Sequence, residues 1–555
     1  MNSKYEFSQD AIDNFMFIHA YWKNSCDGIN AAPENKWGYK RGDIPFIDYL
    51  CEDKSKYPKA SEGISYITNK PLYDPDNDFL IGNSGGILMN IDFIVINIER
   101  LSKAADTFDE YGTYCDYDPS TPAYESFWQR ETSRRKKGVF IKAKLYYKDI
   151  PKFFDANTTD EERESLLQPL RITGAHYTYL NYGRIERTPN DKERARLKRE
   201  GAEHVETVMG FPRYWDGDYW NFKIDEFIAN NKFHLTKAKA RRKGFSYKRG
   251  SQAANTINLF PNVTVTLAAD QLAYLTDKGA TTFMAKKCLD HFEEHTFWKR
   301  GYISEVIDDI LMGYRVSTKG LKNFGWLSNL YSVAIGKNES AAVGKKAIEI
   351  DFEEAGKCPN LQKALDVTLS NTESGAISVG TIRVYGTGGT KGANWAAFSK
   401  AFYNPKMNKM LCMENVWDIN KRHEVCGFFF PQVWDCEPYV ERGNSIIFTA
   451  YAWDKQDKEN HFHNNDSETH IIYKAQRANT PAEAFINTTE NMFASPELNL
   501  HVSDLINDNA TRFFQDGWIV VNDLGNSNKA EFIPKAECIK PVSYTHLRAH
   551  ETDQY

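Results

Sequence analysis

The sequence predicts an α/β protein in which a mostly parallel sheet is flanked by helices. Short apolar, β-prone segments alternate with helical segments between residues 233 and 385, which is the pattern of βαβ units. A basic stretch, a pair of acids and a glycine-rich turn each follow one of the predicted strands. Because ligands of parallel sheets bind at the carboxyl ends of the strands, we expect these three segments to meet at one site.

Composition sets the size and the class of the protein. A chain of 555 residues should form roughly three or four domains, and hydrophobic and aromatic shares of 41% and 14% exclude a disordered protein. The net charge of −6 excludes a nucleic-acid binder that is basic throughout. The chain has no run of about 18 apolar residues, so we expect no transmembrane helix. Nine cysteines without a C-x-x-C pattern indicate reduced thiols in a cytosolic compartment.

Residues 1–205 are expected to form a mixed α+β region of unknown role. A charged helix is predicted from Asp191 to Val205. Two basic runs, at 134–137 and 194–199, are candidate DNA contacts, although such runs are more often solvated faces.

The basic stretch predicts a phosphate-binding loop. It runs from Lys237 to Lys248, after a helix predicted at 223–231 and a β-prone segment at 233–236, and before a helical segment at 250–259. Backbone N–H groups of such a turn and the dipole of the following helix attract an anion. We expect the loop to contact the nucleotide through eight consecutive or nearby positions: Lys239, Arg241, Arg242, Lys243, Gly244, Phe245, Ser246 and Tyr247.

The loop departs from the usual G-x-x-x-x-G-K-[ST] pattern. Phe245 stands where the lysine follows the glycine, and Lys239 stands where the first glycine is usual. We expect Lys239, at the start of the loop, to reach back over the phosphates, with Arg241 and Arg242 as alternatives. Ser246, at the start of the helix, is expected to bind Mg²⁺.

The acids follow a second strand. A buried strand is predicted from Asn262 to Ala269, and the segment 345–352 reads as a further strand that ends in Glu353 and Glu354. Glu353 is predicted to bind Mg²⁺, and Glu354 to orient the attacking water. Asp351 is a competing metal ligand, because strand alternation places it on the same face as Glu353.

The glycine-rich turn completes the set. A strand predicted at 376–385 ends in Gly386-Thr387-Gly388-Gly389, where Thr387 and Gly388 can approach the γ-phosphate. The three motifs together predict an ASCE-type P-loop NTPase domain at 206–495 that binds ATP and Mg²⁺. Its predicted catalytic residues are Glu354, Lys239 and Arg242.

The motifs, in this order, resemble those of the large terminase subunit of tailed phages, in the branch found in crAss-like phages. The segments that carry the resemblance cover about 210–490: Lys239-Ala-Arg-Arg-Lys-Gly244-Phe245-Ser246, Ile350-Asp-Phe352-Glu353-Glu354, Val384-Tyr385-Gly386-Thr387, Ala401-Phe402-Tyr403-Asn404-Pro405 and Thr480-Pro481-Ala482-Glu483-Ala484-Phe485. In lambda-like members a lysine at the start of the loop replaces the one after the glycine. A glutamate at the metal position, where aspartate is more usual, leaves the division of roles between Glu353 and Glu354 open.

The resemblance implies an ATP-hydrolysing motor subunit that translocates viral double-stranded DNA into a procapsid. It implies a pentameric homo-oligomer, with the portal protein and the terminase small subunit as partners and no membrane. The location would be the cytoplasm of the bacterial host and, transiently, the procapsid portal. The family would place adenine contacts near Tyr214 and Trp215, although core packing accounts for these residues equally well.

The C-terminal part does not fit a complete terminase of this kind. The family carries a nuclease domain with separated carboxylates, and residues 496–541 read only as a linker or the start of such a domain. Residues 542–555 resemble an in-frame translation of a sequencing adapter. We therefore expect a C-terminally truncated chain without endonuclease activity.

Two other functions are compatible with the sequence. One is a helicase-like DNA translocase, which should carry a further arginine-bearing motif that we do not find after Gly389. The other is a nucleotide-independent phage structural or portal-associated protein, in which the basic loop is incidental.

Overall fold

A computed structural model describes part of the chain. The described residues are 73–74, 79–80, 101, 104–141, 170–304, 308–317, 321–336, 338, 346–374, 377–388, 393–415, 417–418, 424–445, 447–486, 517–521 and 530–534. Gly389, most of residues 1–100, most of the C-terminal segment after 486 and the adapter-like residues lie outside them. The predictions made for those positions stay predictions.

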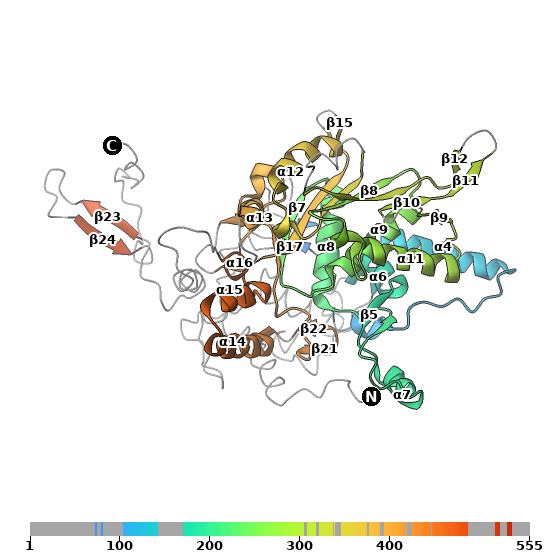
Figure 1. Ribbon diagram of the computed structural model, residues 1–555, viewed down its shortest axis with the longest axis horizontal. Helices are drawn as coiled ribbons and strands as arrows, with labels where there is room; N and C mark the ends of the chain where they lie inside the picture. The colour runs from blue at the N-terminus through green and yellow to red at the C-terminus, as the bar shows by residue number, and fades with distance from the viewer. Residues whose placement is uncertain are drawn as a thin grey trace, which may run out of the picture.

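The central element is an eight-stranded sheet (Figure 1). From one edge to the other its strands are β20 (Phe428–Phe430), β7 (Leu235–Lys239), β17 (Thr381–Thr387), β14 (Glu349–Phe352), β8 (Thr264–Ala269), β13 (Asn329–Ala334), β10 (Asp309–Met312) and β9 (Tyr302–Ile303). The pairs from β20 to β13 are parallel, and β10 and β9 extend the sheet antiparallel. The predicted fold class is confirmed: β17 lies between the loop strand β7 and the acid strand β14, as in the ASCE type.

Helices cover both faces of the sheet. Strand alternation sends Thr236 and Lys237 to opposite faces. Thr236 approaches α13 (Ala393–Tyr403), where its hydroxyl donates to the carbonyl of Ala401 at 3.4 Å. Lys237 lies on the face of α8 (Asp216–Asn231) and binds Asp225 there. On this second face α9 (Phe245–Leu259) packs against α11 (Thr281–His295) and α6 (Gly174–Tyr182). The helix α12 (Leu361–Leu369) instead packs against α13.

The remaining elements are short or peripheral (Figure 1). The helices are α4 (Pro122–Lys137), α7 (Asp191–Arg199), α10 (Ala273–Thr276), α14 (Ile447–Asn464), α15 (Ser467–Gln476), α16 (Pro481–Ala484), η3 (Ala355–Lys357), η4 (Ser370–Thr372) and η5 (Pro405–Asn408). Two-stranded ladders join β1 (Tyr73–Asp74) and β2 (Phe79–Leu80), β3 (Val139–Ile141) and β4 (Leu170–Ile172), β5 (Ile185–Arg187) and β6 (Val208–Gly210), β11 (Tyr314–Ser317) and β12 (Leu321–Phe324), β15 (Glu373–Ser374) and β16 (Ile377–Ser378), β18 (Met413–Glu414) and β19 (Val425–Cys426), β21 (Val440–Glu441) and β22 (Asn444–Ser445), and β23 (Gly517–Val521) and β24 (Ala530–Pro534).

The basic run at 134–137 is in part a core feature. Arg135 is 1% exposed, its guanidinium donates to Asn255 and Asn258 of α9, and it lies 3.9 Å from the centroid of the Trp298 ring. The proposed contact of Arg135 with DNA is therefore wrong, because this side chain is buried beyond the reach of a ligand. The run at 194–199 lies on α7 and is exposed apart from Leu197. The helix ends at Arg199 instead of Val205.

Two expectations concern the described residues as a whole. Within them, no helix combines the length and the apolarity needed to cross a bilayer. The side chains of Cys412, Cys426 and Cys436, which are scattered along the chain, are buried in the core.

Candidate nucleotide site

The predicted loop closes over the carboxyl end of β7. The strand ends at Lys239 and α9 begins at Phe245. Gly244, the residue before the helix, has φ 65°, and Arg242 has φ 63°. The left-handed conformation at Gly244 suits glycine, and this residue has no side chain with which to cap the helix. The first N–H groups of α9 therefore have no capping side chain at this position and point toward the space above the sheet, where an anion is stabilised by the helix dipole.

Lys239 lies at the centre of the site. Its Nζ donates to Oγ1 of Thr387 at 3.0 Å and lies 3.7 Å from Oε1 of Glu354. The three residues come from the ends of β7, β17 and β14, which are neighbours in the sheet. The structure thus brings together one residue from each of the three predicted motifs, and it places the lysine from the start of the loop among them.

Glu353 faces the start of the loop helix. Ser246 Oγ donates to one carboxylate oxygen of Glu353, and Thr281 Oγ1 donates to the other. Burial raises the pKa of the Glu353 carboxyl to about 7, and the charge of Glu354 adds to this, while the two hydroxyls and Lys239 act in the opposite direction. A divalent cation would relieve that cost by compensating the buried negative charge.

Thr281 was not predicted from the sequence. It is the first residue of α11 and is fully buried. A single threonine at the start of a helix carries no recognisable signal, because its partner Glu353 lies 72 residues away in the chain. Only the packing of α11 against α9 shows that its hydroxyl orients Glu353.

Glu354 turns away from its neighbour. It has φ 50° and a side chain that is 28% exposed, and its carboxylate faces the ammonium groups of Lys239 and Lys357. A non-glycine residue in the left-handed region costs energy, and such residues occur often at functional sites. The adjacent acids therefore face different partners: Glu353 faces the hydroxyl of Ser246, and Glu354 faces the cation Lys239.

Asp351, the competing metal ligand, is not accessible. Its side chain is 0% exposed and its two carboxylate oxygens bind the guanidinium groups of Arg249 and Arg383 at 2.6 and 3.3 Å. A carboxylate held by two buried arginines has no position left for a cation. The alternative in which Asp351 takes the metal role is therefore wrong. Strand alternation puts Asp351 on the same face as Glu353, but one pleat deeper, where the two arginines enclose its carboxylate.

The other basic residues of the loop differ in where their side chains point. Arg241 donates to the side chain of Gln476 at 2.9 Å, at the end of α15. Arg242 is exposed. The Nζ of Lys243 donates to the carbonyls of Gln432 and Trp434 at 2.7 and 2.6 Å, so this residue can serve an anion only through its backbone N–H group.

Phe245 is a packing residue. Its ring is buried, at 5.4 Å from the ring of Phe430 and 6.1 Å from that of Tyr385. It thus anchors the start of α9 to the sheet, and any contact with a nucleotide is left to its backbone.

A pocket of about 230 Å³ opens beside the loop. Arg242, Gly244 and Tyr247 line it on the loop side, and Arg187, Thr188, Arg213 and Trp215 are among the residues on the other side. Tyr214 instead packs in the core, where its ring stacks on that of Phe108 with the centroids 6.1 Å apart. Of the aromatic pair predicted near the nucleotide, one residue lines the pocket and the other belongs to the core.

The residues present fit a magnesium ion. Ser246 and Glu353 supply hard oxygen ligands, and among the described residues no three His, Cys, Asp or Glu side chains gather as a metal site of their own. Mg²⁺ typically binds through one or two protein oxygens together with phosphate oxygens and water. The donor set therefore suits an ion that arrives with a phosphate ligand.

Comparisons with known proteins find likeness at the level of structure. No protein-family model and no curated protein matches the chain. The large terminase ATPase domain of Thermus phage P74-26 matches with 12% identity over 52% of this chain and 97% of that chain, at a TM-score of 0.31. The large terminase of a thermophilic bacteriophage, in complex with ADP, matches with 9% identity over 47% of this chain and 52% of that chain, at a TM-score of 0.27. Because these values are low, the fold assignment rests on the strand order and the loop geometry.

Proposed function

We propose that this chain is an Mg²⁺-dependent ATPase and that it acts as the motor subunit of a phage DNA-packaging machine. The observation that carries the ATPase proposal is the meeting of Lys239, Thr387 and Glu354 beside the start of α9. Each comes from a different predicted motif, and 354 − 239 = 115 residues separate the lysine from the glutamate. A basic turn with an incidental role would not need these partners at its end.

The phosphates would lie over the N–H groups at the start of α9. Lys239 and Arg242 would compensate the charge that develops on the transferred phosphoryl group. Ser246 and Glu353 would hold Mg²⁺, which when bound neutralises phosphate charge and orients the phosphate oxygens. Glu354 would orient the attacking water and accept its proton, a role worth roughly 10²–10⁴ in rate. The hydroxyl of Thr387, bound to Lys239, would sense whether the γ-phosphate is present.

The pocket beside the loop would receive the nucleoside. Trp215 offers an aromatic face. Arg187 and Arg213 line the same pocket, with guanidinium groups that bind Glu193 and Glu110. A purine is larger than the other parts of a nucleotide and gains most from an apolar or aromatic wall. Because the pocket lies next to Gly244 and Tyr247, a base bound in the pocket would leave the phosphates at the loop.

The motor role goes further than the ATPase chemistry. It is supported by the resemblance of the five sequence segments to those of large terminases and by the order of the strands that carry them. We propose double-stranded DNA, a portal protein and a terminase small subunit as partners, and a pentamer as the working assembly. The site of action would be the cytoplasm of a bacterial host, with the subunit transiently at the procapsid portal.

The decisive experiment is an ATPase assay with the full chain. It would measure Mg²⁺-dependent phosphate release alone, with double-stranded DNA, and with DNA and portal particles. A packaging motor predicts hydrolysis that rises when both partners are added. A helicase-like translocase predicts stimulation by DNA alone and separation of a forked duplex, and a structural protein predicts neither ATP binding nor hydrolysis.

A further inference from the structure

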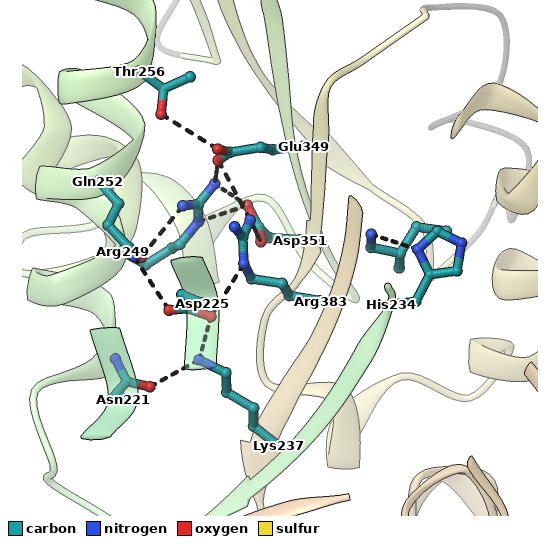
Figure 2. A network of polar contacts seen from close by, with 11 residues as sticks. Asn221, Asp225, His234, Lys237, Arg249, Gln252, Thr256, Glu349, Asp351 and Arg383 are labelled. Carbon is teal, nitrogen blue, oxygen red and sulfur yellow. Dashed lines mark hydrogen bonds and ion pairs between the residues drawn. The ribbon is translucent and has the colours of Figure 1, made fainter. Parts of the chain in front are cut away.

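A cluster of six charged side chains, drawn in Figure 2, lies on the strands and the loop helix that carry the candidate nucleotide site and on α8. Three are cations and three are carboxylates, and we call them the ionic layer: Lys237, Arg249, Arg383, Asp225, Glu349 and Asp351. The most exposed side chain among them, that of Glu349, is 14% exposed. The layer is thus a buried, charge-balanced network in the body of the domain.

Four of the proposed site residues, Lys239, Glu353, Thr387 and Ser246, have a member of the ionic layer within four positions in the chain. Lys237 precedes Lys239 by two residues, and Asp351 precedes Glu353 by two, so strand alternation puts each pair on one face. Arg383 precedes Thr387 by four residues on β17, again on the same face. Arg249 follows Ser246 by three residues, which places it one turn further along α9.

Arg249 joins two carboxylates of the ionic layer to the loop helix α9. Its Nε donates to Oδ2 of Asp351 at 2.6 Å, and its Nη2 binds both Asp351 and Glu349. Both carboxylates belong to β14. The guanidinium therefore fastens α9 to the strand that carries Glu353, as the contacts in Figure 2 show.

Arg383 on β17 and Lys237 on β7 extend the ionic layer from β14 to the next two strands of the sheet. Arg383 binds Asp351 at 3.3 Å and Asp225 of α8 at 3.2 Å. Lys237 donates to Asp225 at 2.5 Å and to Asn221 at 2.8 Å. The layer thus ties β7, β17 and β14 to α8, one or two pleats below the site residues of the strands. Arg249 is the member of the layer that belongs to α9, and Gln252 and Thr256 of the same helix add single hydrogen bonds to Asp225 and Glu349 at 3.2 and 3.4 Å.

We infer that Arg249 is a positioning residue that sets the separation of Ser246 and Glu353, the two groups proposed to hold Mg²⁺. The inference rests on the proposed function. A shift of α9 along β14 would change the distance between these ligands, and the planar, bidentate guanidinium resists that shift because its donors meet two carboxylates of one strand. A lysine keeps the charge but, as a single ammonium on a flexible stem, cannot hold both carboxylates in the same fork geometry.

The test is Arg249→Lys in the full chain, with binding of a fluorescent ATP analogue measured in EDTA and across a Mg²⁺ titration. We expect the Mg²⁺ concentration that gives half-maximal tightening to rise about tenfold, which is the usual effect of removing a group that orients a metal ligand. Binding in EDTA should change less than about twofold, because the phosphate loop and Lys239 remain. Turnover should fall while the KM for ATP at saturating Mg²⁺ stays close to that of the wild type.

Arg135→Lys is the matched control. Arg135 is also buried and also binds α9, through Asn255 and Asn258, but these contacts do not involve β14. Both variants should lower the melting temperature, and only Arg249→Lys should shift the Mg²⁺ titration. If Arg249→Lys does not fold, Glu349→Gln removes one carboxylate at the rim of the layer and should produce the same kind of shift at a smaller size.

The outcomes separate the inference from the proposed function. A wild-type chain without Mg²⁺-dependent nucleotide binding would overturn both. Wild-type binding with indistinguishable titrations for Arg249→Lys, Glu349→Gln and Arg135→Lys would overturn the inference alone. Equal loss of binding with and without Mg²⁺ would also overturn it, because Arg249 would then support the whole loop instead of the ligand pair.

Discussion

Two lysines on one strand show how this sheet uses charge. Lys237 and Lys239 lie two residues apart on β7 and face the same side of the sheet. Lys237 is enclosed by Asp225 and Asn221, and burial lowers its pKa to about 8. Lys239 contacts one hydroxyl and lies at a longer distance from one carboxylate. Lys237 thus has two internal partners at hydrogen-bond distance, whereas Lys239 has one, and its ammonium is the group that would face the proposed phosphates.

The acids repeat this contrast on β14. Asp351 binds two arginines, and Glu353, one pleat above, binds two hydroxyls. A buried carboxylate paired with arginines is compensated internally, whereas one held only by hydroxyls remains costly until a cation arrives. The difference teaches that residue type and strand face do not separate a structural charge from a ligand-binding one. The depth along the strand does.

The largest expected effect is the loss of ATP turnover on replacing Glu354, one of the proposed site residues at the strand ends. Glu354→Gln should reduce ATP turnover by at least about 100-fold, because an amide cannot accept the proton of the attacking water. Binding of the ATP analogue with Mg²⁺ should stay within about threefold, since the shape of the side chain is retained. Glu373→Gln, at a half-buried acid paired with Lys409, is the control. Turnover that survives Glu354→Gln would remove this residue from the chemistry.

The two lysines give the sharpest form of the comparison. Lys239→Met should cost about 100-fold in turnover with little change in stability, because a charge that would face the phosphates is lost. Lys237→Met leaves Asp225 with one fewer cation in the interior and should lower the free energy of unfolding by about 3–5 kcal/mol. Urea denaturation and steady-state kinetics measure the two effects. If the two lysine variants changed turnover and the free energy of unfolding equally, the distinction between a site lysine and a structural lysine would be contradicted. Loss of turnover only in Arg241→Ala or Arg242→Ala would assign the phosphate role to an arginine.

A pH effect is expected at the start of β7. His234 is buried, its Nδ1 accepts a hydrogen bond from the N–H of Ile382, and burial lowers its pKa to about 4. The unfolded chain, with a histidine pKa of about 6.5, takes up the proton first as the pH falls. Stability is therefore lost below about pH 6.5, by about 2 kcal/mol between pH 7.5 and pH 5.

His234→Gln should flatten this dependence, because the amide oxygen can accept the same hydrogen bond without titrating. Urea denaturation at the two pH values measures the effect, and the exposed His204→Gln serves as the control. His291, whose pKa burial also lowers to about 4, should maintain part of the slope. A slope identical to that of the wild type in His234→Gln would show that His234 does not titrate in the way proposed.

The smallest effect is expected for Arg242→Ala. The side chain is exposed beside the pocket and is expected to interact with phosphate through solvent-screened charge. Affinity for the ATP analogue should fall by about three- to tenfold and should vary with salt. Arg199→Ala, on the exposed face of α7, should change neither. A larger loss than that of Lys239→Met would reverse the assignment of these two cations.

The predicted elements agree closely with the structure in the part of the chain that forms the eight-stranded sheet. The strands expected at 262–269 and 345–352 correspond to β8 and β14, and the helix expected at 250–259 is the main part of α9. The two strands are short segments that are buried on both faces, and α9 is buried over most of its length. The helix expected at 223–231 starts earlier, at Asp216, because its aromatic first turns are buried against the core. The antiparallel strands β10 and β9 were not predicted, since short edge strands lack a distinctive pattern.

The site divides in the same way. The local pattern identified the loop, the pair of acids and the threonine after the third strand, because each is a short motif at the end of an apolar run. It could not separate Asp351 from Glu353, since alternation makes their faces equal. It also missed Thr281 and Arg249, whose partners lie 72 and 102 residues away. Contacts of this range depend on how α9 and α11 pack on the sheet.

The sequence by itself determined that a basic loop, two acids and a glycine turn follow three strands of an α/β sheet, because secondary structure and strand order in βαβ units depend on local periodicity and turn chemistry. The tertiary structure alone decided which charges remain directed at a ligand. Long-range packing places Arg249 and Arg383 against Asp351 and leaves Glu353 with Ser246 and Thr281. Burial and pairing depend on neighbours distant in the chain, and these determine whether a charged residue is paired within the sheet or left for the proposed nucleotide.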